Sequence, residues 1–125
     1  MKELVEKIKS FTDLIVWQEG HKLVIFVYKT TDSFPQKEIY GLVSQMRRAA
    51  VSITSNIAEG FSRNSSKEKV QFYYTAKGSL SEIQNQFIIA KDLGYSDNAK
   101  YEEGLRRIEK VSRLIYGLIR SIKNS

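Results

Sequence analysis

The chain has 125 residues and no cysteine, and its 20 lysines and arginines exceed its 14 aspartates and glutamates to give a net charge of +6. Its length suits one domain with a sizeable core, and the lack of cysteine excludes disulfides, cysteine-ligated zinc and thiol catalysis. Charges interrupt the first residues, MKELVEKIKSFTD, and the longest apolar run, LVIFVY, is far shorter than the roughly 20 residues that span a bilayer. We therefore expect a single soluble, cytoplasmic domain over residues 1–125, with no membrane partner.

The first half of the chain predicts two helices. Residues 1–12 are expected to form a loose lead-in, followed by a helix over about 14–31 that Thr12 or Asp13 caps. Its buried face is predicted at helical spacing from Trp17, His21, Val24 and Tyr28. After Pro35, a second helix is expected to end near Gly60, with a buried stripe of Ile39, Leu42, Met46, Ala50, Ile53 and Ile57.

The second half predicts two more helices. Ser65 and Glu68 have the spacing of a capping box, and Gly94 suits the end of the helix that they open. Its predicted buried face consists of Tyr73, Ala76, Leu80, Ile83, Phe87 and Ala90. Ser96 or Asp97 is expected to open the last helix, with a stripe of Tyr101, Leu105, Ile108, Ile115, Ile119 and Ile122. Four amphipathic helices with short loops predict an all-α, antiparallel up-down four-helix bundle.

The outward face of the second helix carries small residues where a solvated face usually carries lysine and glutamate. Either this helix is the most buried one of the bundle, or it lies at a seam between subunits. Apolar residues also point outward from the first and third helices, which favours a homo-oligomer or a protein partner. The candidate interface residues are Ile15, Phe26, Ser44, Val51, Ser55 and Ile89.

The positive charge is concentrated in two segments, since residues 39–81 hold six basic and two acidic residues and residues 104–125 hold six and one. A basic stripe on the last helix suits either a phosphate track for RNA or DNA or an ordinary solvated face. The candidate phosphate-binding residues are Arg47, Arg48, Arg63, Lys67, Lys69, Arg106, Arg107, Lys110, Arg113 and Arg120.

Patterns of catalysis and cofactor binding are missing from the sequence. A di-iron bundle needs Glu-x-x-His pairs, whereas the only histidine is His21 and residue 18 is glutamine. We interpret His21 as a hydrogen-bonded histidine of the core or its boundary. Neither Gly-x-Ser-x-Gly nor a glycine-rich phosphate loop is present. We therefore expect no catalytic residue, no metal and no cofactor, and a protein that is not an enzyme.

Three segments carry a family resemblance: DLIVWQEGHKL, FPQKEIYGLVSQMRRAAVSITSNIAEG and EKVQFYYTAKGSLSEIQNQFIIAKDLGY. Together they resemble the four-helix bundle proteins encoded by intervening sequences in bacterial 23S ribosomal RNA genes. This resemblance implies a homo-pentameric ring whose biochemical role is not settled. It also implies a relation to the accessory protein of diversity-generating retroelements, which suggests nucleic acid or a reverse transcriptase as partner.

Structural roles are expected for three residues of the tract RRAAVSITSNIAEGFSR. Glu59 is expected to pair with Arg63, four residues later, or with an arginine on a neighbouring helix, and Gly60 is predicted to leave the helix with a positive φ. Asn56 is expected to hydrogen-bond a loop backbone and to hold one end of the bundle together.

Overall fold

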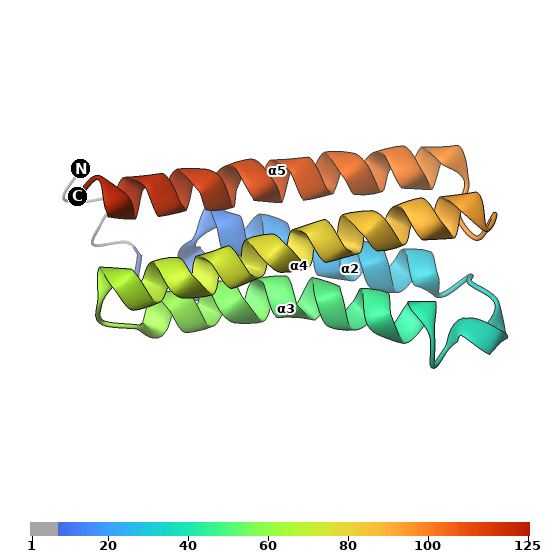
Figure 1. Cartoon of the computed structure of the whole chain (residues 1–125), viewed down its shortest axis with the longest axis horizontal. Helices are drawn as coiled ribbons and strands as arrows, with labels where there is room; N and C mark the ends of the chain where they lie inside the picture. Colours follow the sequence, from blue (N-terminus) through green and yellow to red (C-terminus); the bar gives the residue numbers. More distant parts are fainter. Residues whose placement is uncertain (1–7) are drawn as a thin grey trace.

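The computed structural model describes residues 8–125, which form four long α-helices and two single-turn 3-10 helices (Figure 1). The helices are η1 (Phe11–Asp13), α2 (Ile15–Thr31), η2 (Gln36–Glu38), α3 (Leu42–Ser62), α4 (Ser66–Asp92) and α5 (Asn98–Lys123). In Figure 1, α2 and α4 run in one direction and α3 and α5 in the other. Both α2 and α4 pack against α3 and against α5. The predicted all-α four-helix bundle is confirmed.

The core consists mainly of the stripes that the sequence predicts on the last three helices. All six predicted residues of α4 are buried, as are Ile108, Ile115 and Ile119 of α5. On α3 the stripe from Leu42 to Ile57 is buried. The largest fully buried side chains are Leu23, Val27, Met46, Ile53, Ile57, Tyr73, Ile83, Phe87, Val111 and Ile115.

The predicted buried face of α2 is only partly correct, since Trp17 and Val24 are half-buried against the core. His21 and Tyr28 are exposed, and the core instead receives Val16, Leu23 and Val27. This face is rotated by about 100° from the expected one, which corresponds to one residue position. Because LVIFVY is apolar on every side, its spacing does not distinguish between the two faces.

Phe26 is also misplaced by the sequence pattern. It was expected to point outward as an interface residue, but only 8% of it is exposed, and its ring stacks on that of Phe87 with centroids 6.1 Å apart. Phe26 lies on the side of α2 that faces α5, as its closeness to the Arg107 guanidinium shows. It belongs to the core and not to an oligomer interface.

The start of α3 depends on a carboxylate in the preceding turn. Glu38 accepts hydrogen bonds from the Leu42 N–H (3.1 Å) and from the Tyr95 hydroxyl (2.8 Å). The bond from the Leu42 amide, followed by that from Tyr95, lowers the pKa of Glu38 below its ordinary value, and the same carboxylate raises the pKa of Tyr95. Since this cap starts the helix at Leu42, Ile39 lies in the turn and is exposed, contrary to its predicted place in the buried stripe.

The cap predicted for the first helix is wrong. Neither Thr12 nor Asp13 caps α2, whose N-cap is Leu14 without a side-chain hydrogen bond. Asp13 instead completes a capping box with Ser10 around η1, because its carboxylate accepts the Ser10 N–H at 3.1 Å.

The caps predicted for the last two helices are largely confirmed. The Ser65 hydroxyl accepts the Glu68 N–H at 3.1 Å, which is the serine half of the predicted capping box. Gly94 ends α4 with φ of +76°, a conformation that glycine adopts without steric penalty. The Asp97 carboxylate caps α5 by accepting the Lys100 N–H at 2.8 Å.

Two tract residues have roles that differ from those predicted. Gly60 lies within α3, and among the described residues only Gly94 has a positive φ. Asn56 donates to the Ser52 carbonyl (2.8 Å) and not to a loop, and the Ser52 hydroxyl lies 2.9 Å from that of Ser79. The tract therefore contributes to a polar network between the middles of α3 and α4.

Residues 1–7, which include most of the expected lead-in, lie outside the described residues. From residue 8 onward, no helix combines the length and apolar character needed to cross a membrane. Over the same residues, His, Asp and Glu side chains form no cluster of three or more that could hold a metal ion.

Candidate nucleic-acid interface

Basic side chains line a groove between α2 and α5. The groove consists of two adjoining hollows of about 410 and 320 Å³ that share Glu103 and Arg107 on their walls. We call it the basic groove and define it by six cationic residues: Lys22, Lys29, Lys100, Arg106, Arg107 and Lys110. The sequence predicted three of these, Arg106, Arg107 and Lys110, and missed the other three.

Two carboxylates also line the basic groove, and both are paired. Glu19 lies 3.0 Å from the Lys22 amine and 3.2 Å from that of Lys110, so it joins α2 to α5. The hydrogen bond from Lys22 is the main reason that the pKa of Glu19 lies below its ordinary value, although burial opposes it. Glu103 lies 2.9 Å from the Arg107 guanidinium. Six cations and two ionised carboxylates leave the groove positively charged.

The floor of the basic groove is partly aromatic. The Arg107 guanidinium lies 5.3 Å from the centre of the Phe26 ring, and the Lys100 amine lies 5.9 Å from it. The nearby Thr30 is buried, and its hydroxyl has no hydrogen-bond partner in residues 8–125. His21, predicted in the core or at its boundary, is exposed at the rim, where its ring stacks on that of Trp17 with centroids 4.9 Å apart. The groove therefore combines fixed apolar surface with cationic groups at its edges.

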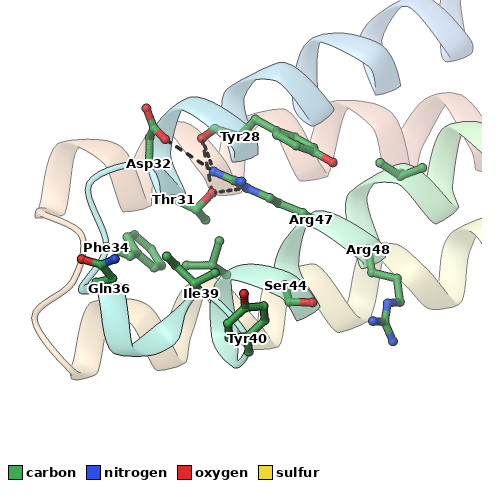
Figure 2. A pocket seen from close by; sticks show the side chains of 12 residues that line it. Tyr28, Thr31, Asp32, Phe34, Gln36, Ile39, Tyr40, Ser44, Arg47 and Arg48 are labelled. Atoms are coloured by element: carbon green, nitrogen blue, oxygen red, sulfur yellow. Dashed lines mark hydrogen bonds and ion pairs between the residues drawn. The ribbon is translucent and has the colours of Figure 1, made fainter.

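Arg47, a predicted phosphate contact, is held at the end of α2 (Figure 2). Its guanidinium donates to the Thr31 hydroxyl (3.0 Å) and to the Tyr28 carbonyl (3.2 Å). It also lies 4.6 Å from the centre of the Tyr28 ring and 3.7 Å from the Asp32 carboxylate. These contacts cap the carbonyl end of α2. Arg48 is exposed and projects away from this cluster in Figure 2.

Two of the three predicted cations near the α3–α4 connection also have partners. The Lys69 amine donates to the Phe61 carbonyl at 2.7 Å and so caps the end of α3. Arg63 pairs with Glu59 at 3.1 Å, as the sequence predicts. Lys67 is exposed in the first turn of α4. Lys69 and Arg63 thus have structural contacts that a phosphate would have to replace.

The remaining predicted cations lie on the outward face of α5. Arg113 is 3.8 Å from Glu109, and its side chain is largely exposed. The Arg120 guanidinium lies 5.8 Å from the centre of the Tyr116 ring. Neither Arg113 nor Arg120 lines the basic groove; both lie on α5 beyond its edge.

A second gathering of cations lies between α4 and α5, at the end of α5. We call it the tyrosine–cation cluster; its members are Tyr74, Lys77, Tyr116, Arg120 and Lys123. Of these five residues, only Arg120 is a candidate phosphate contact from the sequence. The sequence does show tyrosines at outward helical positions near lysines. This pattern is common, however, and it indicates a cluster only once α4 and α5 are known to lie side by side.

The family model that describes the 23S rRNA-intervening sequence protein matches residues 12–117. The chain belongs to this family. The resemblance seen in the sequence is thereby confirmed, and no curated protein matches the chain. The matched residues of this 23S rRNA-intervening sequence family member include the whole basic groove but end before Arg120 and Lys123.

This 23S rRNA-intervening sequence family member also has an apolar groove of about 800 Å³ at the junction of α2 and α3 (Figure 2). We call it the end groove. Tyr40 on its wall is 97% exposed, and Ile39 and Val51 beside it are also exposed. The interface candidates Ser44 and Val51 line this groove, and Ser55 is exposed one turn further along α3. Of the other candidates, Ile15 and Ile89 are exposed elsewhere on the bundle.

Proposed function

We propose that this protein binds RNA or DNA through phosphate contacts in the basic groove and catalyses no reaction. The observation that carries the proposal is the excess of cations there, six against two paired carboxylates. By contrast, Arg47 and Lys69 use their charged groups to cap helices of their own chain.

The dimensions of the basic groove suit a nucleic acid backbone. Its α5 residues run from Lys100 to Lys110, a rise of about 15 Å along the helix axis. One strand of duplex DNA presents a phosphate about every 3.4 Å along its axis, so about four phosphates fit this length. Such contacts bind with little regard to sequence and weaken with salt.

Lys29, Lys100 and Arg106 offer the sharpest test, because within residues 8–125 none of them forms an ion pair. The variant Lys29→Gln/Lys100→Gln/Arg106→Gln should bind a labelled duplex more weakly than the natural chain. The plot of log affinity against log salt has a negative slope, and its magnitude should decrease by about 2 to 3, as expected when three phosphate contacts are lost. Fluorescence anisotropy at three or more salt concentrations measures both quantities.

A matched control removes the same charge elsewhere. Lys9, Lys37 and Lys91 are exposed outside the basic groove, so Lys9→Gln/Lys37→Gln/Lys91→Gln should keep a steeper salt slope than the groove variant. Equal slopes in the two variants would remove the basic groove from the proposal. Failure of the natural chain to bind any nucleic acid at low salt would reject nucleic-acid binding altogether.

Self-association is a second candidate function, which the exposure of Tyr40 favours. The end groove lies beside the α2–α3 connection, and a second apolar groove of about 740 Å³, lined by Ile8, Ile15 and Leu114 among others, lies beside the start of α2. Figure 1 shows these two segments toward opposite ends of the bundle. Two different apolar surfaces on one chain suit a head-to-tail contact, which forms a ring when its rotation closes. A homo-pentamer is the ring that the family resemblance implies, and a protein adaptor would use the same surfaces for another partner.

Light scattering of the variant Tyr40→Ser tests self-association. If the end groove joins copies of this chain, the variant should have a lower mass than the natural chain at equal concentration. Its thermal unfolding as a monomer should change little, because the Tyr40 side chain lies almost wholly in solvent. A natural chain that is monomeric at high concentration would contradict self-association and leave the adaptor function for these surfaces.

A further inference from the structure

The tyrosine–cation cluster holds charged groups against exposed aromatic rings. Tyr116 is 53% exposed and Tyr74 is 46% exposed. The Lys77 amine lies 4.6 Å from the centre of the Tyr116 ring, and the Arg120 guanidinium lies 5.8 Å from it. The Lys123 amine lies 5.3 Å from the centre of the Tyr74 ring and donates to its hydroxyl at 3.1 Å. Two half-exposed rings thus share three cations.

These three cations have no carboxylate partner in the described part of the chain. Each ion pair found there joins other residues, whereas Lys77, Arg120 and Lys123 rest on rings. At an exposed site, a cation binds a ring more weakly than it binds an ionised acceptor through a charge-assisted hydrogen bond. An arriving phosphate would therefore draw the cations off the rings and uncover the ring faces.

The cluster is placed so that one strand could reach it from the basic groove. Tyr116 lies six residues after Lys110 on α5, which corresponds to a rise of about 9 Å and a turn of about 120° around the helix, from the side that faces α2 to the side that faces α4. Arg113 lies between them on α5 and is largely exposed. A strand whose phosphates leave the groove near Lys110 would meet Arg113 and then the two tyrosine rings.

We infer that the tyrosine–cation cluster binds an unpaired segment of RNA or DNA, with bases stacked on Tyr74 and Tyr116 and phosphates on Lys77, Arg120 and Lys123. A base has a free face for such stacking only where it is unpaired, since a duplex stacks each base between its neighbours. The inference rests on the proposed function and deepens it, because it makes the preferred ligand a single strand or a loop. Stacking accepts any base, so it predicts little dependence on sequence.

The test compares a 15-nucleotide single-stranded RNA with a 15-base-pair RNA duplex at one salt concentration. The natural chain should bind the single strand more tightly. The variant Tyr74→Leu/Tyr116→Leu should bind the single strand at least about tenfold more weakly, the effect expected for one lost stacked base. Its affinity for the duplex should change by less than about twofold, because the basic groove is intact.

The matched control keeps the rings and removes only the hydroxyls. Tyr74→Phe/Tyr116→Phe should bind the single strand within about twofold of the natural chain, and circular dichroism should show all three proteins folded to the same extent. Equal affinity of the natural chain for both probes, with no loss in the leucine variant, would overturn the inference and leave phosphate binding in the groove standing. Absence of binding to either probe at low salt would overturn the proposed function as well.

Discussion

The substitution Phe26→Ser is expected to lower the free energy of unfolding by about 3–5 kcal/mol, the range for removing a buried phenylalanine ring. Phe26 is only 8% exposed, stacks on Phe87 and forms the floor of the basic groove under Arg107. The change removes this ring and leaves a hydroxyl in its place within the core. Urea unfolding followed by circular dichroism measures the difference.

Ile15→Ser is the matched control for Phe26→Ser. Both residues are large and apolar, and the sequence placed both on the outward side of the first helix, but Ile15 is 63% exposed. Its replacement should therefore change the free energy of unfolding by no more than about 0.5 kcal/mol. Similar losses in the two variants would contradict the burial of Phe26. The contrast also means that lost partner binding in Phe26→Ser would report a damaged fold and not a removed contact.

The two residues illustrate what periodicity can and cannot predict. On α3, α4 and α5, polar residues separate the apolar stripes, so the buried faces follow from spacing alone. On α2 the segment LVIFVY offers apolar residues in every direction. Its orientation is decided by neighbours that are distant in sequence, Phe87 on α4 and Arg107 on α5. No pattern within α2 contains that information.

The candidate site was predictable only in part for a related reason. A basic stripe on the last helix is visible in the sequence, and Arg106, Arg107 and Lys110 do line the basic groove. Lys22 and Lys29 join them because α2 packs beside α5. Conversely, Arg47 and Lys69 look like free cations in the sequence, yet they bind backbone carbonyls at helix ends. Sequence composition locates the charge, and the packing decides which charges remain available.

Gly60→Ala is expected to lower the free energy of unfolding by about 1–3 kcal/mol, as overpacking a core does. A methyl group at Gly60 would lie 2.5 Å from Cε1 of Tyr73, whose ring is buried and cannot move aside without disturbing the core. Burial also raises the pKa of the Tyr73 phenol above its ordinary value. Close packing, and not a positive φ, is thus the reason for a glycine at this position of the family tract.

Gly78→Ala is expected to have the opposite effect, an increase in the free energy of unfolding. Gly78 lies within α4 and is exposed, and beyond its own stretch of helix no atom of the described residues lies within 4 Å of the position that a methyl group would take. Because alanine has a higher helix propensity than glycine, the free energy of unfolding of this variant should rise by about 0.5–1 kcal/mol. The double variant Gly60→Ala/Tyr73→Leu should lose less free energy of unfolding than the sum of the losses in the two single variants, since the smaller leucine side chain relieves the close contact. If both alanine variants were stabilised alike, contact with the Tyr73 ring would not be the reason for a glycine at position 60.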